Sequence, residues 1–85
     1  MTKAEQKVPP MQISDGEIKR LEAYMQTTFN NDQINLRARA KTTDSVEVML
    51  GQEFIGVIYK DEDEGETSYN FNMAILDIDL PGDLA

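Results

Sequence analysis

The chain has 85 residues, a net charge of −8, and neither cysteine nor histidine. This length predicts one domain near the lower size at which a hydrophobic core alone is sufficient. The two missing residue types exclude disulfides, thiolate or imidazole metal sites, and histidine as an acid or base. The chain also lacks an apolar run of the ~18 residues that a transmembrane helix needs and a signal-peptide core, so we expect a cytoplasmic protein with no membrane partner.

The charge is distributed unevenly along the chain. Residues 1–60 contain equal numbers of basic and acidic residues, whereas residues 61–85 contain eight acidic residues and no basic one. Acidic surfaces repel the phosphate backbone, and three basic residues on one strand are too few to reverse this, so we expect no nucleic-acid partner. A basic protein partner would be attracted.

Residues 1–13 contain two adjacent prolines and no sustained periodicity, which predicts a flexible N-terminal arm. A capping-box spacing, Ser14-x-x-Glu17, follows and predicts the start of a helix. Apolar residues then recur at helical spacing until Phe29, where we expect the helix to end.

Two strands are expected next. Residues 34–41 alternate strictly between apolar and polar, which is typical of a half-buried strand. If residues 42–44 form the loop to a strand over residues 45–50, Ala40 lies opposite Val46.

Gly51 and Gln52 predict a two-residue hairpin turn into a third strand that runs to Lys60. This register places Val48 opposite Ile55. It also assigns Phe54 and Ile58 to the second face of the sheet, opposite the face that the helix covers.

An acidic connection, residues 61–66, leads to a predicted fourth strand over residues 68–80. The apolar phase of that strand changes after Ile75, so its later residues face the second side. The expected fold is therefore α+β, with an N-terminal helix packed on a four-stranded antiparallel meander. The domain would cover residues 14–80, followed by a short tail, residues 81–85.

The acidic connection also suggests a cation site, because hard cations bind clustered oxygen ligands. The candidate ligands are Asp61, Asp63, Glu64 and Glu66. The EF-hand pattern fails, since Glu66 stands where that loop requires glycine. A solvated, self-repelling hairpin loop is the simpler interpretation, and we predict no metal site of a defined kind.

The second face of the predicted sheet is too apolar to be left in water. Its candidate interface residues are Met49, Phe54, Ile58, Leu76 and Ile78. They predict a surface for a second copy, as a homodimer, or for another protein. The alternative is that the N-terminal arm covers this face with Val8, Met11 and Ile13.

Catalysis has few candidate groups in this chain. Without histidine or cysteine, a mechanism would depend on carboxylates, lysine, tyrosine or a serine with no evident base. We therefore predict no enzyme, no catalytic residue and no cofactor. The leading hypothesis is a small acidic interaction module, and the alternative is a domain that responds to a cation or small ligand through residues 61–66.

The stretch GQEFIGVIYKDEDEGETSYNFNMAILDIDL, residues 51–80, is similar to a family of small alphaproteobacterial proteins known only as a domain of unknown function. The likeness runs from about Asp15 to Leu80 and is carried by FIGVIY, DEDEG and FNMAILD together with helix residues 18–25. It implies a bacterial cytoplasmic origin. It brings no activity, cofactor or catalytic residue.

Overall fold

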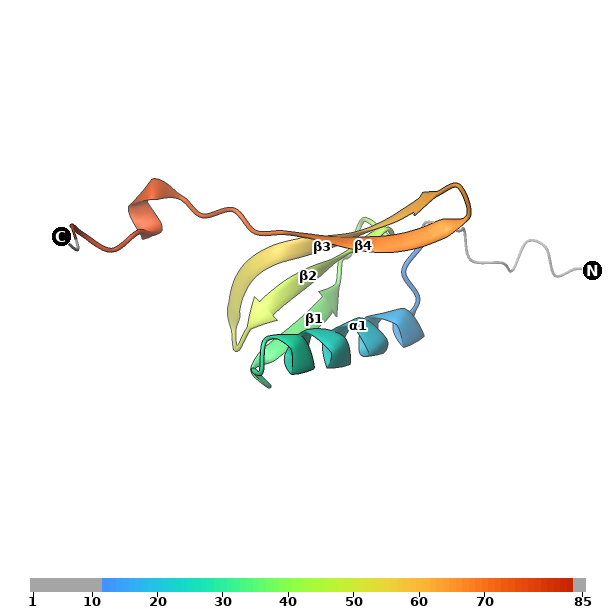
Figure 1. Cartoon of the computed structure of the whole chain (residues 1–85), viewed down its shortest axis with the longest axis horizontal. Helices are drawn as coiled ribbons and strands as arrows, with labels where there is room; N and C mark the ends of the chain where they lie inside the picture. Colours follow the sequence, from blue (N-terminus) through green and yellow to red (C-terminus); the bar gives the residue numbers. More distant parts are fainter. Residues whose placement is uncertain (1–11, 84–85) are drawn as a thin grey trace, which may run out of the picture.

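The computed structural model describes residues 12–83, and it contains one helix and one sheet. The elements in chain order are α1 (Asp15–Thr28), β1 (Ile34–Ala38), β2 (Ser45–Leu50), β3 (Glu53–Asp63), β4 (Glu66–Asn72) and a 3₁₀ helix (Asp77–Asp79). The strands are antiparallel in the order β1-β2-β3-β4, with α1 along one face (Figure 1). The predicted fold, a helix on a four-stranded antiparallel meander, is confirmed.

Both predicted ends of α1 are confirmed. The Glu17 amide donates to the Ser14 hydroxyl at 3.1 Å, and the Glu17 carboxylate accepts from the Ser14 amide at 2.9 Å, which completes the capping box. At the other end the Phe29 amide donates to the Met25 carbonyl. Asn30 then adopts a left-handed backbone with φ of 52°, which stops the helix.

The hydrophobic core lies between α1 and the sheet. Its buried members are Ile13, Met25, Ile34, Leu36, Val46, Val48 and Ile58. Ile13 is held there by a bond from its amide to the Thr43 carbonyl. The prediction that residues 1–13 are all a flexible arm is therefore wrong at its last residue, and Ile13 does not cover the second face; Val8 and Met11 lie outside the described residues.

The β1–β2 hairpin has a longer loop than predicted. Ala38, not Ala40, lies opposite Val46, so the register differs by two residues. The Ser45 hydroxyl is buried and bonded to Arg39 and Thr42, which holds residues 39–44 in the loop. Because the shift is even, every apolar side chain of β1 stays on the predicted face.

A β-bulge in β3 changes the face assignment that the sequence predicts. The turn at Gly51 is as predicted, with φ of 63°, and Met49 lies opposite Phe54. The register then shifts, so Val48 lies opposite Gly56 rather than Ile55. One extra residue in a strand exchanges its two faces from that point on. Ile58 consequently lies opposite Val46 in the helix-covered core, and its predicted place on the second face is wrong.

The acidic residues form a strand hairpin rather than a long loop. β3 continues to Asp63 and β4 begins at Glu66, so only Glu64 and Gly65 form the turn. Both have positive φ, 52° and 84°, as a type I′ turn requires. Asp63 and Glu66 lie directly opposite each other, where like charges repel, and the exposure of this hairpin to water screens that repulsion.

The turn residue Glu64 stores backbone strain, which gives a test of this hairpin. Replacing it with asparagine, which tolerates the left-handed region, should raise the free energy of unfolding by about 0.5–1 kcal/mol. Urea unfolding at fixed protein concentration measures this. Glu64→Gln is the matched control, because it removes the same charge and keeps the strain. Equal gains from both variants would show that charge, and not the turn, sets the effect.

β4 is shorter than predicted. Its last pair is Asn72 with Val57, and residues 73–76 are extended without a strand partner. Beyond Val57, β3 reaches its bulge and curves away, so the ladder cannot continue. The predicted strand over residues 68–80 is therefore corrected: the sheet ends at Asn72. Figure 1 shows the following segment leading away from α1 and the sheet.

Candidate functional site

An apolar groove lies on the helix side of the sheet, between α1 and the β3–β4 pair. It has a volume of about 520 Å³. We call it the α1–β4 groove, and its lining residues are Glu17, Arg20, Leu21, Tyr24, Met25, Thr28, Phe29, Ile58, Tyr69 and Phe71. Most of its lining is aromatic or aliphatic, and polar groups occupy the end nearest the start of α1.

The groove exists because one helix cannot cover four strands. The outer strands of such a sheet lie about 14 Å apart, whereas a helix with its side chains is about 10 Å wide. α1 makes its main contacts with β1, which leaves β4 uncovered. Tyr24 and Phe29 project from the uncovered side of the helix and are 66% and 54% exposed. Exposed aromatic rings beside a groove are typical of binding surfaces.

The predicted interface residues do not form one surface. Met49 lies on the second face but is only 5% exposed, Ile58 is in the core, and Phe54 is 54% exposed opposite Met49. Leu76 and Ile78 follow the sheet instead of belonging to it, and Ile78 is 85% exposed. The second face also carries the facing pair Arg37 and Glu47. The unfinished apolar surface is thus the α1–β4 groove together with residues 73–80.

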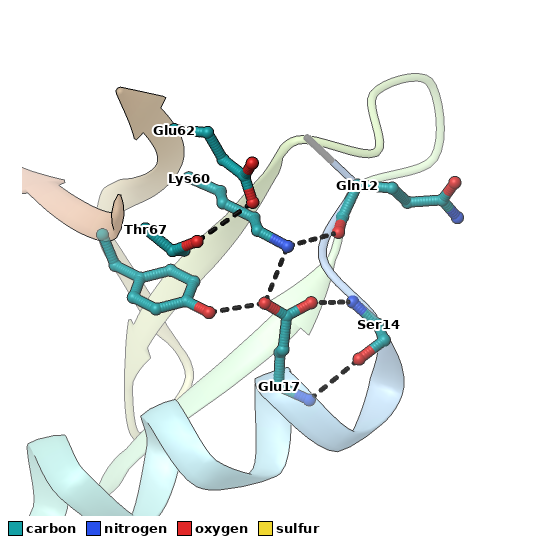
Figure 2. A network of polar contacts seen from close by, with 7 residues as sticks. Gln12, Ser14, Glu17, Lys60, Glu62 and Thr67 are labelled. Carbon is teal, nitrogen blue, oxygen red and sulfur yellow. Dashed lines mark hydrogen bonds and ion pairs between the residues drawn. The ribbon is translucent and has the colours of Figure 1, made fainter. Parts of the chain in front are cut away.

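A polar network closes the end of the groove near the start of α1. Lys60 on β3 places its Nζ 2.8 Å from a Glu17 carboxylate oxygen and 3.1 Å from the Gln12 carbonyl (Figure 2). The Tyr69 hydroxyl donates to the same Glu17 oxygen. The pairing of Lys60 with Tyr69 in the β3–β4 ladder brings both groups over α1. The network ties the first turn of the helix to the hairpin.

The network fixes the protonation states of its members. Burial raises the pKa of the Glu17 carboxyl, but the hydrogen bonds from Lys60, Tyr69 and the Ser14 amide, with the charge of Lys60, outweigh it and lower the pKa to about 2. The hydrogen bond to Glu17 and burial raise the pKa of Tyr69 to about 12. Glu17 stays ionised and Tyr69 stays protonated near neutral pH. This arrangement is suited to holding structure and not to transferring protons.

The candidate cation ligands are not gathered by the hairpin. Asp63 and Glu66 flank the turn, and Asp61 lies opposite Ser68. Within residues 12–83, no group of three or more acidic side chains is placed to hold a metal ion. The geometry gives no support to a cation-responsive loop at Asp61, Asp63, Glu64 and Glu66.

Sequence reasoning missed the network, although the chain contains a signal for it. Glu17 was assigned only its capping role. Counting the hairpin from a turn at Glu64 and Gly65 places Lys60 opposite Tyr69 on the apolar face. A lysine on the core-facing side of a strand requires an acidic partner, because its charge is partly buried. The first turn of the helix packed on that side offers one, the capping carboxylate of Glu17.

A family model described as "Protein of unknown function (DUF3126)" matches residues 17–79. The chain belongs to this family. The match confirms the resemblance noted in the sequence, and it spans α1 from its third residue, the whole sheet and the 3₁₀ helix. No curated protein matches the chain, and no solved structure does. The family match therefore includes the α1–β4 groove and nearly all of the exposed segment after β4.

α1 has 14 residues and carries several charged side chains. In the part of the chain that the structure describes, no helix is long and apolar enough to cross a membrane.

Proposed function

We propose that this member of the family is a non-enzymatic interaction module that binds an extended, apolar segment of protein in the α1–β4 groove. The observation that carries the proposal is an open groove of about 520 Å³ lined by aromatic and aliphatic side chains. Tyrosine, phenylalanine, methionine and arginine are enriched at protein interfaces, and the groove contains all four.

The polar groups of the groove support a structural partner more than a reactive ligand. Glu17 is already bonded to Lys60, Tyr69 and Ser14, so it has little capacity to bind or activate a substrate. Arg20 is the remaining charged group of the lining. It suits an acidic or carbonyl-rich segment lying along the helix.

The acidic hairpin would act on a partner before that partner reaches the groove. Residues 61–66 contain five carboxylates at the end of a strand pair that extends into solvent. Their field would favour approach of partners with a basic region and disfavour polyanions. In this proposal they set the rate and selectivity of encounter, while the groove supplies the affinity.

A photo-cross-linker tests the proposal directly. Tyr24 is replaced by a benzophenone amino acid in the full chain in cells, and Tyr59, an exposed tyrosine on the other face of the sheet, is replaced as the matched control. We expect protein adducts from position 24, with the attachment site in one apolar segment by mass spectrometry. Equal adducts from position 59, or no protein adduct from position 24, would contradict a groove that binds protein.

A further inference from the structure

Residues 73–80, which we call the 73–80 arm, expose an apolar surface after the sheet has ended. The large exposed side chains of the arm are Met73, Ile75, Leu76, Ile78 and Leu80. The hydrogen bonds that shape it are local: the Asp79 amide donates to the Leu76 carbonyl and the Leu80 amide to the Asp77 carbonyl. Figure 1 shows the arm extending away from α1 and the sheet. Five large apolar side chains exposed to water within eight residues indicate a segment that is covered in the working protein.

We infer that the arm of one copy lies in the α1–β4 groove of a second copy, and that the second copy returns its own arm in the same way. The result is a twofold dimer with two identical arm–groove contacts. This inference rests on the proposed function, because it names the apolar segment that the groove binds.

The dimensions of the two surfaces match. Five extended residues at about 3.3 Å each and the three residues of the 3₁₀ helix at about 2 Å each reach about 22 Å, and the 14-residue helix that forms one wall of the groove is about 21 Å long. The arm can therefore run along the whole wall. Its aliphatic side chains complement the aromatic rings of Tyr24, Phe29 and Phe71.

Within the contact the charges also match, although two chains of net charge −8 repel each other overall. The arm carries Asp77 and Asp79 between its apolar residues and has no basic residue. The groove offers Arg20, which forms no ion pair with any other residue of the described range 12–83. An arm lying along α1 brings its carboxylates to this guanidinium, which gives the contact a preferred direction.

The path of the chain favours a second copy over the arm's own groove. Phe71 of β4 already lines that groove, and Figure 1 shows the chain after β4 leading away from α1. Entering its own groove would require the chain to reverse at once, yet residues 73–80 contain no glycine or proline and Leu76 is extended, with φ of −87° and ψ of 149°. An extended arm that leaves its own domain is suited to exchange between identical copies.

The test uses two full-length variants that are defective in opposite halves of the contact. The arm variant carries Ile75→Ser and Ile78→Ser, and the groove variant carries Tyr24→Ser and Phe29→Ser. All four side chains are exposed, so circular dichroism and thermal unfolding should show folded chains. Phe54→Ser is the matched control, since Phe54 is equally exposed on the other face.

Light scattering across a dilution series and native mass spectrometry give the result. We expect the unaltered chain and Phe54→Ser to dimerise alike, and the arm and groove variants each to dimerise on the order of 100-fold more weakly. Mixing those two variants should restore mixed dimers, because such a pair retains one intact arm and one intact groove in contact. If the two copies instead paired arm to arm or groove to groove, mixing the two variants would not restore the dimer.

Other outcomes would overturn the inference. An unaltered chain that stays monomeric at every concentration, an arm variant that dimerises normally, or loss of the dimer in Phe54→Ser alone would each do so. If the chain is monomeric while position 24 still cross-links another protein, the inference fails and the proposed function stands. If position 24 also yields no protein adduct, both fail.

Discussion

Replacing Gly56 by alanine should lower the free energy of unfolding by about 3 kcal/mol, because the added methyl has no space. A Cβ at this position would lie 2.5 Å from the backbone oxygen of Asn72 and 2.6 Å from the ring of Phe71. The ring can rotate, but the backbone of β4 cannot retreat without breaking its last pairs with β3. Urea unfolding at fixed protein concentration measures the loss.

Gly16→Ala is the matched control for this substitution. Gly16 lies in the first turn of α1, and a Cβ there meets only the Ser14 hydroxyl at 3.9 Å. Alanine is the better helix former, so this variant should gain about 0.5–1 kcal/mol. If both glycines lose or gain stability together, the close approach of β4 to Gly56 does not determine the result.

Replacing Glu17 by glutamine should cost about 2–3 kcal/mol at neutral pH, because it leaves the Lys60 ammonium without its carboxylate. The two side chains are only 17% and 9% exposed, so water compensates little for the loss. Asp15→Asn, also in the first turn of α1, is the matched control for removing an acidic residue there and should cost a few tenths of a kcal/mol. Equal losses would show a helix-dipole effect instead of a network.

The same network predicts a specific pH dependence. The folded-state pKa of Glu17, about 2, lies below the ordinary glutamate value of 4.5, so its stabilisation is complete above pH 4.5 and is lost as the pH falls toward 2. The pKa of Tyr69, about 12, lies above the ordinary tyrosine value of 10.0, so its contribution is complete below pH 10 and is lost as the pH rises toward 12. Glu17→Gln should remove most of the acid-side slope.

Local rules predicted the parts of this fold that depend on neighbours in the sequence. The capping box at Ser14 marked the start of α1, and strict alternation in residues 34–41 assigned the faces of β1 correctly even though its register was two residues wrong. Face assignment is robust there because an even shift leaves it unchanged. The meander followed from short connections between successive strands.

The errors in the faces of β3 and in the length of β4 have one physical origin, the bulge between the Val48 and Met49 pairs. Nothing in QEFIGVIYK requires an extra residue, and the bulge is favoured by tertiary contacts that bring Ile58 into the core and β4 over Gly56. It moved Ile58 between faces, and the end of the β3–β4 ladder left Leu76 and Ile78 outside the sheet. The change in the apolar pattern over residues 73–80 does reflect a structural change, which is the end of pairing between β4 and β3.

The sequence predicted the candidate site only in part, because the site also depends on tertiary contacts. The sequence indicated that an apolar surface is left uncovered and that Leu76 and Ile78 belong to it. It could not assign the groove, because the groove forms between α1 and β4, which are 38 or more residues apart in the chain and meet through Glu17 and Tyr69. The interface stays a prediction, but it is now assigned to the helix side of the sheet instead of the second face.

The most direct test of the arm–groove contact is an isotope-filtered nuclear Overhauser measurement on a mixed sample. Half of the full chains carry ¹³C-labelled isoleucine methyls, and the other half are unlabelled. We predict contacts between the methyls of Ile75 and Ile78 in the labelled copies and the rings of Tyr24 and Phe29 in the unlabelled ones. If those methyls contact rings only within their own copy, or no ring at all, the exchanged arm is wrong.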